Sequence, residues 1–217
     1  MGPSDDRLRA NALGFVRASL DCFTDYAGAN RTLVDKMLEK GEAFLAEAPD
    51  APVRDTDQAP VARWLEPAIA HGRDQISGAP DHPVFTCLEN IAEQLPWELG
   101  YDGPSLSEEF RANFGYVFIA GPGGLVECDW FAAGVTMMGP DIYYDWHHHP
   151  AHEFYINFSQ TASWGLDLGE LSRRKFQDMI VIPGGTHHAM RSGSQPFLAP
   201  WLWIGDIHTP SEFSEPS

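Results

Sequence analysis

The sequence predicts a mainly β protein, a small barrel or sandwich preceded by a helical region, and three observations support that class. Apolar residues recur at helical spacing through the first half of the 217-residue chain. Near residue 113 the pattern changes to short aromatic and β-branched runs that glycine or proline separates. A hydrophobic content of 43% is enough for a real core. We therefore expect a helical region over residues 1–112 and a β-barrel over residues 113–217.

The helical region begins with two long apolar patterns that Gly28 separates. Two shorter helices follow a proline- and aspartate-rich connector, APDAPVRDTDQAP. Pro60 and Pro83 stand where the first turn of a helix tolerates proline. The expected helices cover about Asp5–Tyr26, Leu33–Leu45, Val61–Ile69 and Val84–Leu95. We expect this region to pack against the barrel or to cap it.

The second half contains short runs that read as strands between tight turns. They are FGYVFIAGPGG, GLVECDWFAAGVTMMG, EFYINFSQTASWGLDL, KFQDMIVIPGG and PFLAPWLWIGDIH. Many short strands with glycine or proline between them are typical of a small all-β sandwich or barrel.

Composition excludes several classes of protein. Fourteen basic residues against thirty-one acidic ones give a formal charge of −17, which argues against nucleic acid or an anionic membrane as a partner. No apolar run approaches the roughly 20 residues that span a bilayer. The N-terminus carries acidic residues where a signal peptide has basic ones. We expect a cytoplasmic protein whose cysteines, Cys22, Cys87 and Cys128, are ordinary reduced thiols.

Histidines gather in one part of the chain, since six of the nine lie between His147 and His188. On a strand, alternate side chains share a face, so His147 and His149 point the same way. Pro150 and Ala151 then suit a bend. After that bend Glu153 and Tyr155 again share one face, and the stretch can bring two imidazoles, a carboxylate and a phenol to one interior point. Tyr144 and Tyr143 open the stretch and should face opposite ways.

A second segment, PGGTHH, follows some thirty residues later. Its Pro183 and Gly185 form a tight turn that can aim His188 back into the barrel mouth. Two or three imidazoles and a carboxylate suit one divalent transition metal ion, namely Zn, Fe(II), Mn, Co or Ni, with positions left open for water or substrate. His148, His152 and His187 neighbour the proposed ligands, and each could replace one if the register slips.

These two segments resemble the two-part metal motif of the cupin superfamily. HxHxxxE matches at His147, His149 and Glu153, and PxGxxH matches with His188 as its histidine. The resemblance implies a cupin barrel, the jelly-roll-like double-stranded β-helix, with these four residues as metal ligands. Many chemistries share one fold, so an Fe(II) dioxygenase, an isomerase and a non-catalytic ligand sensor stay open as alternatives. A sensor usually carries a basic DNA-binding helix-turn-helix, whereas the helical half here is acidic.

The tyrosines narrow the resemblance to one family within the cupins. The run Tyr144-x-x-His147-x-His149-x-x-x-Glu153-x-Tyr155 resembles the bacterial cupin-type dimethylsulfoniopropionate lyases of the DddQ, DddL and DddW group. That resemblance implies Tyr155 as the catalytic base and Tyr144 as a residue that orients the substrate carboxylate or assists. It implies dimethylsulfoniopropionate (DMSP) as the small-molecule substrate, cleaved by β-elimination to dimethyl sulfide and acrylate. A homodimer is compatible with the sequence.

Elimination by a tyrosine base beside a divalent cation is chemically reasonable without reference to the family. The leaving group departs as a neutral sulfide, so elimination needs a base and no general acid. A free phenol has a pKa of about 10, and lowering it by about 3 units requires roughly 4 kcal/mol of stabilisation of the phenolate. A nearby divalent cation is a source of that stabilisation. Aromatic faces attract the sulfonium cation, and the candidates for this contact are Trp130, Trp146, Trp164, Trp201 and Trp203.

Overall fold

The protein is described here from a computed structural model that covers residues 3–50, 59–76, 81–101 and 106–214. The helices, with η marking 3-10 segments, are α1 (Pro3–Asp21), α2 (Arg31–Glu47), η1 (Pro60–Trp64), α3 (Leu65–Gln75), α4 (Pro83–Ile91), η2 (Ala92–Gln94) and α5 (Glu108–Asn113). All four expected helices are present, although α1 ends earlier than the apolar pattern suggested. Pro60 and Pro83 begin their helices as expected. Most of the proline- and aspartate-rich connector lies outside the described residues.

The sequence pattern did not indicate α5, because six residues are too few to show helical periodicity. Its local signals are nevertheless present. The Ser107 hydroxyl accepts a hydrogen bond from the Phe110 amide at 3.0 Å, and Glu108 and Glu109 occupy the first turn. An N-cap serine and early acidic residues stabilise the amino end of a helix. This short helix leads the chain directly into the first strand.

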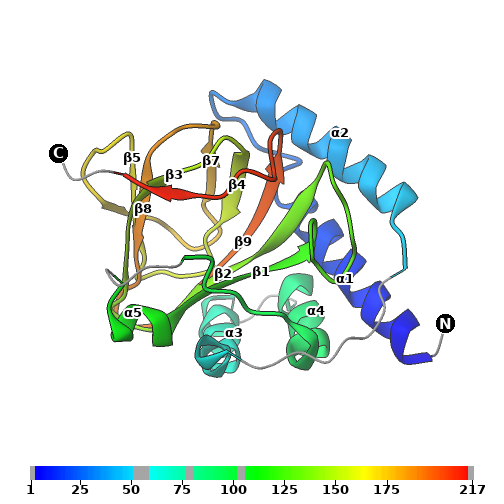
Figure 1. The fold of residues 1–217 in the computed structure, drawn as a ribbon, viewed down its shortest axis with the longest axis horizontal. Helices are drawn as coiled ribbons and strands as arrows, with labels where there is room; N and C mark the ends of the chain where they lie inside the picture. Colours follow the sequence, from blue (N-terminus) through cyan, green and yellow to red (C-terminus); the bar gives the residue numbers. More distant parts are fainter. Residues whose placement is uncertain (1–2, 51–58, 77–80, 102–105, 215–217) are drawn as a thin grey trace.

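Two antiparallel sheets of five strands each form the second half, which confirms the expected barrel (Figure 1). The first sheet has the order β1-β2-β9-β4-β7 and the second has the order β10-β3-β8-β5-β6. The strands are β1 (Phe114–Ala120), β2 (Ala132–Met138), β3 (Tyr143–His148), β4 (His152–Ile156), β5 (Ser163–Leu166), β6 (Ser172–Arg173), β7 (Met179–Ile182), β8 (His188–Arg191), β9 (Phe197–Ile204) and β10 (Glu212–Phe213).

Side chains of the first sheet alternate between the helices and the barrel interior. In β4, Phe154 and Ile156 belong to the apolar cluster shared with the helices, whereas Tyr155 belongs to the cluster inside the barrel. Phe154 meets Phe23 edge to face, with ring centroids 6.0 Å apart. The same alternation holds along β9, where Leu202 faces the helices and Trp201 faces the interior. The period-two pattern of a strand thus decides which side chains reach the cavity.

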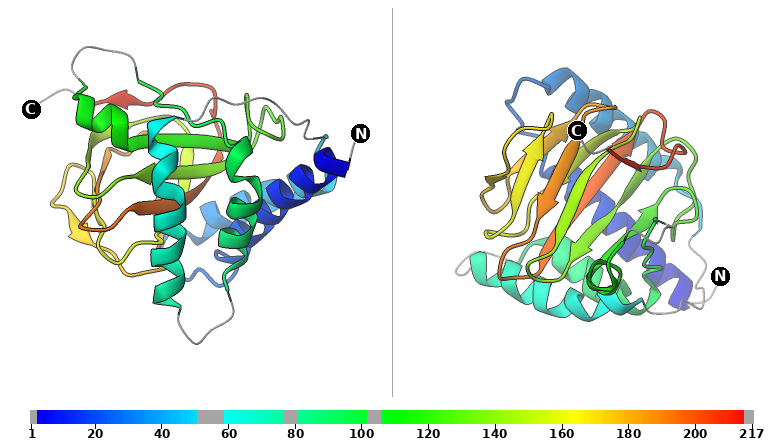
Figure 2. Two further views of the ribbon diagram at one scale, coloured as in Figure 1. Left: turned by 90° about the horizontal axis from the view of Figure 1, so that it is seen from below. Right: turned by 60° about the vertical axis from the view of Figure 1, so that its left-hand side comes forward.

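Helices α1 to α4 gather on the outer side of this first sheet, whereas α5 lies at one end of the barrel, as Figures 1 and 2 show. Helices α1, α2 and α3 all contact β9, and one buried apolar cluster includes Phe15 of α1, Val61 of η1 and Val117 of β1. The helical region therefore backs the sheet that carries Glu153 and Tyr155. The expected boundary falls where α5 ends and β1 begins; that the two parts form separate units stays a prediction. Within the ranges described, no helix combines the length and apolar character that crossing a bilayer requires.

Candidate active site

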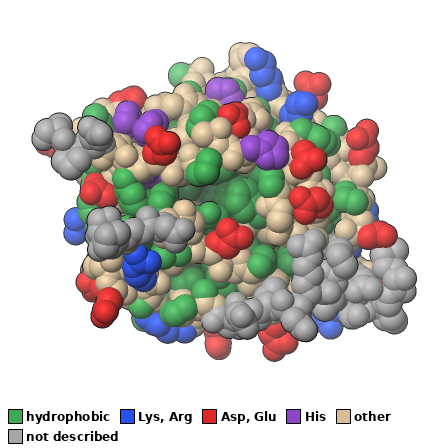
Figure 3. Space-filling model, in the orientation of Figure 1, with side chains coloured by type: hydrophobic (Ala, Val, Ile, Leu, Met, Phe, Trp, Pro, Cys, Tyr) green, Lys and Arg blue, Asp and Glu red, His purple; other side chains and the backbone are tan. Residues whose placement is uncertain are grey.

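A cavity of about 220 Å³ opens between the two sheets. Figure 3 shows this hollow near the middle of one face, surrounded mainly by hydrophobic side chains. Aromatic rings make much of its wall, and polar side chains are grouped together within it. The aromatic residues are Tyr101, Phe114, Tyr116, Phe118, Trp201 and Trp203. The polar group includes Thr136, Tyr144, His147, His149, Glu153 and Tyr155.

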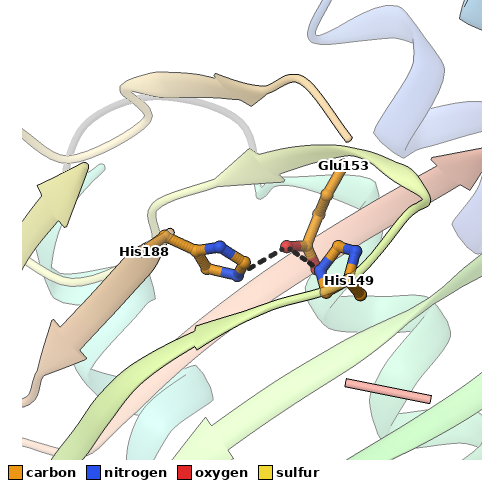
Figure 4. Close-up of side chains that lie close together, drawn as sticks. All are labelled: His149, Glu153 and His188. Atoms are coloured by element: carbon orange, nitrogen blue, oxygen red, sulfur yellow. Dashed lines mark hydrogen bonds and ion pairs between the residues drawn. The ribbon is translucent and has the colours of Figure 1, made fainter. Parts of the chain in front are cut away.

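Three buried side chains converge on one point at this cavity. Ligand atoms of His149, Glu153 and His188 all lie within 4.8 Å of one another. The Oε2 atom of Glu153 is 3.1 Å from His149 Nε2 and 3.2 Å from His188 Nε2 (Figure 4). These residues come from the loop after β3, from β4 and from the start of β8. The two separated sequence segments therefore meet, as the motif predicts.

Local backbone geometry accounts for this convergence. The amide of Gly185 donates to the carbonyl oxygen of His149 at 2.8 Å, which ties the PGGTHH turn to the end of β3. Gly185 has a φ of +80°, a conformation that glycine adopts without steric cost. Residues His147 and His188 are partners in the β3–β8 register. The turn and the register together bring His188 to the ends of β3 and β4.

Backbone carbonyls fix the orientation of the imidazoles. The Nδ1 atom of His149 donates to the Ala151 carbonyl at 3.1 Å, and that of His188 donates to the Thr186 carbonyl at 2.9 Å. Because a carbonyl only accepts, Nδ1 of each ring carries a proton, and a ring that acts as a metal ligand would turn an Nε2 lone pair to the site. His188 Nε2 is buried and faces the carboxylate of Glu153. Two imidazole Nε2 atoms and a carboxylate therefore face one point, and this donor set fits a divalent metal ion.

The carboxylate of Glu153 is held from its other side as well. Its Oε1 atom accepts a 2.7 Å hydrogen bond from the indole Nε1 of Trp203. Burial alone would raise the pKa of Glu153, but the charge and hydrogen bonding of His149 and His188 outweigh it and the net pKa is lowered. The glutamate is therefore ionised in the ordinary pH range, as a metal ligand must be.

His147 lies beside this group and its own nitrogen is not part of it. Its ring centroid is 4.0 Å from that of His188, and its Nδ1 donates to the Asp145 carbonyl at 2.8 Å. The Tyr144 ring stacks on it at 3.7 Å. Burial, assisted by the charge of His188, holds the pKa of His147 well below its ordinary value, so the ring is neutral. Its role as a fourth ligand stays a prediction.

The neighbouring histidines have other partners. His148 and His187 lie together, with ring centroids 4.5 Å apart, and His187 Nδ1 is 2.6 Å from the Ser214 hydroxyl. The Nδ1 atom of His152 accepts from the Gly184 amide at 2.8 Å. None of these three belongs to the convergent group. His147 and His149 both line the cavity, so the expected register is the one observed.

The two tyrosines of the motif both reach the cavity. Tyr155 presents its Oη atom 3.3 Å from the Thr136 hydroxyl, and its ring meets Trp164 edge to face at 4.8 Å. Burial and then the negative charge of Glu153 raise the pKa of Tyr155 well above its ordinary value. Burial and the neighbouring Tyr101 raise the pKa of Tyr144 in the same direction. Both phenols are therefore protonated in the protein alone.

Sequence reasoning missed Tyr101, whose hydroxyl hydrogen-bonds to that of Tyr144. Tyr101 lies in the segment before α5 and belongs to no motif, so only the fold shows that it reaches the cavity. Of the candidate tryptophans, Trp201 and Trp203 line the cavity. Trp130 lies partly exposed under Lys40, and Trp164 is buried behind Tyr155. Trp146 packs near Gly165 of β5.

A two-sheet barrel with a buried His-Glu-His group at its cavity defines a cupin with a candidate metal centre. The family model for dimethylsulfoniopropionate lyase matches residues 31–199, which include the His-Glu-His group, His147, Tyr144 and Tyr155. The chain therefore belongs to the dimethylsulfoniopropionate lyase family, a family of carbon–sulfur lyases.

Individual relatives agree with this assignment. The dimethylsulfoniopropionate lyase DddQ of Ruegeria pomeroyi is 34% identical over 113 residues. That alignment covers 52% of this chain and 56% of the relative, so the chain spans about half the length of the curated relative it matches. The crystal structure of DddQ from the same organism superposes with a TM-score of 0.66 at 25% identity, covering 84% of this chain and 96% of that one. A crystal structure reported for the DMSP lyases RdDddP and RnDddQII shares the fold, with a TM-score of 0.71 at 22% identity, over 96% of this chain and 100% of that one.

Proposed function

We propose that this protein is a metal-dependent lyase that cleaves DMSP to dimethyl sulfide and acrylate. The observation that carries the proposal is the placement of Tyr155 and the His-Glu-His group around one cavity. Family membership supplies the substrate class. The four motif residues His147, His149, Glu153 and His188 would hold one divalent ion. When bound, such an ion supplies positive charge that binds the substrate carboxylate and lowers the pKa of the neighbouring phenol.

The residues of the chain divide the remaining tasks. Tyr155, as the phenolate, takes the proton from the α-carbon of the substrate at its Oη atom and becomes the neutral phenol. The electron pair of that C–H bond forms the double bond between the α- and β-carbons, and the bond from the β-carbon to sulfur breaks with its pair on sulfur. Dimethyl sulfide leaves neutral, acrylate keeps its carboxylate, and the proton is left on Tyr155 for return to solvent.

The cavity wall suits the cationic end of the substrate. Trp201 and Trp203 lie with ring centroids 5.1 Å apart, and Phe118 meets both of them edge to face. Aromatic faces attract sulfonium and ammonium cations, and an apolar wall excludes water from the reacting carbon. Tyr144, which hydrogen-bonds to Tyr101 and stacks on His147, would orient the carboxylate end.

The test is headspace detection of dimethyl sulfide from purified, metal-loaded protein supplied with DMSP. We expect wild-type protein to release sulfide and Tyr155→Phe to lose about 100- to 10,000-fold in kcat, the range for a general base. The matched control is Tyr143→Phe, because the Tyr143 ring lies under Arg191 and outside the cavity lining. Metal-loaded wild-type protein that releases no sulfide would overturn the proposal. A fully active Tyr155→Phe would overturn only the assignment of the base.

A further inference from the structure

The barrel face of β2 carries one polar side chain beside the proposed base. Ala132 and Met138 of this strand belong to the interior apolar cluster, whereas Thr136 is a polar residue with only 3% of its surface exposed. Burying a hydroxyl costs free energy unless it is hydrogen-bonded. The Thr136 hydroxyl is bonded at the reactive atom itself, because its Oγ1 lies 3.3 Å from Tyr155 Oη.

Tyr155 is thus held from two sides. The edge-to-face contact with Trp164 orients its ring, and the Thr136 hydroxyl holds its oxygen together with the carboxylate of Glu153. Two of these contacts come from elements other than β4, since Thr136 belongs to β2 and Trp164 to β5. A phenol supported in this way keeps one orientation toward the cavity, and a reacting group held in the right geometry gains rate over one that moves.

We infer that Thr136 is a positioning residue for the base Tyr155, an inference that rests on the proposed lyase function. A hydroxyl both donates and accepts hydrogen bonds. Thr136 can therefore donate to the phenolate before proton transfer and accept from the phenol afterwards, so the contact persists through the step. A valine at this position has nearly the same shape and can do neither.

The experiment compares Thr136→Val with Thr136→Ser in metal-loaded protein. The hydroxyl role predicts that the valine variant loses about 10- to 100-fold in kcat, as for a hydrogen bond to a charged group, with KM changed less than about threefold. The hydroxyl role also predicts that kcat of Thr136→Ser is at least about tenfold higher than kcat of Thr136→Val. A packing role predicts the opposite order, because valine keeps the threonine shape whereas serine leaves a methyl-sized void.

Metal content and thermal unfolding of both variants are measured alongside, to show that each is folded and loaded. Wild-type kcat in Thr136→Val, or a serine variant slower than the valine variant, would overturn the positioning role while leaving the lyase function intact. If metal-loaded wild-type protein releases no dimethyl sulfide, the proposed function fails and this inference fails with it.

Discussion

The hydrogen bond from Trp203 to Glu153 should affect how tightly the candidate metal site binds a divalent ion. Glu153 is 1% exposed, and its Oε1 accepts from the indole at 2.7 Å. A short hydrogen bond to a buried carboxylate is at the strong end of the range, about 1.5 to 3 kcal/mol. At about 1.4 kcal/mol per factor of ten, Trp203→Phe should weaken metal binding by about 10- to 100-fold. Phenylalanine keeps an aromatic ring on the cavity wall and removes only the donor and part of the ring.

The matched control is Trp201→Phe, which removes an indole from the same wall two residues away on the same face of β9. Metal affinity is measured by competition with a chromogenic chelator, starting from protein stripped of metal. We expect the Trp201 variant to bind within about threefold of wild type, because Trp201 pairs with Tyr155 in the β4–β9 register and Trp203 pairs with Glu153. Equal metal affinities for the two variants would refute the argument that the indole hydrogen bond holds the ligand in place.

Two further predictions concern stability. The pKa of His147 is held well below its ordinary value in the folded protein. As the pH falls through the unfolded pKa of about 6.5, the unfolded chain therefore binds a proton that the folded chain does not, and the free energy of unfolding decreases. Between pH 7.5 and 5.5 the free energy of unfolding of the metal-free protein, measured with urea, should decrease by about 1.4 kcal/mol less in His147→Gln than in wild type. The same decrease in both proteins would contradict this. Leu168 is 57% exposed and has a φ of +58°, next to Asp167 at +52°. Because glycine adopts a positive φ without steric strain, Leu168→Gly should raise the free energy of unfolding by about 0.5 to 1 kcal/mol. Leu168→Ala should leave the free energy of unfolding nearly unchanged.

The parts of the fold that the sequence predicted are those with a long regular signal. Helices α1 and α2 carry extended apolar periodicity, and the strands around β4 and β9 carry dense aromatic and β-branched runs. Short elements were missed for a physical reason. Helix α5 depends on a serine cap, and β10 is two residues that pair with His147 and His148 only once β3 exists. Their stability comes from tertiary contacts, which a local pattern does not show.

In the candidate site, too, the sequence predicted some residues and missed others. The convergence of the candidate ligands could be predicted from the chain, because His149, Glu153 and His188 lie in two short segments whose geometry a strand and a turn fix. The supporting residues could not, because Thr136, Tyr101 and Trp203 come from other parts of the chain and meet the site only through sheet pairing and the segment before α5. Trp203 appeared among the aromatic candidates, but for a contact with the sulfonium and without its bond to Glu153.

The register between β4 and β9 explains why a carboxylate, a phenol and two indoles share one cavity. Glu153 pairs with Trp203 and Tyr155 pairs with Trp201, so an E-x-Y spacing on one strand meets a W-x-W spacing on the other. A slip of one residue would turn Glu153 and Tyr155 toward the helices and put Phe154 into the cavity. Phe154 is fully buried against Phe23, so that slip would also expose the helix-facing core to two polar groups. The packing of the helices on this sheet therefore opposes the slip, and the helical half in this way supports the β4–β9 register that brings Glu153 and Tyr155 to the cavity.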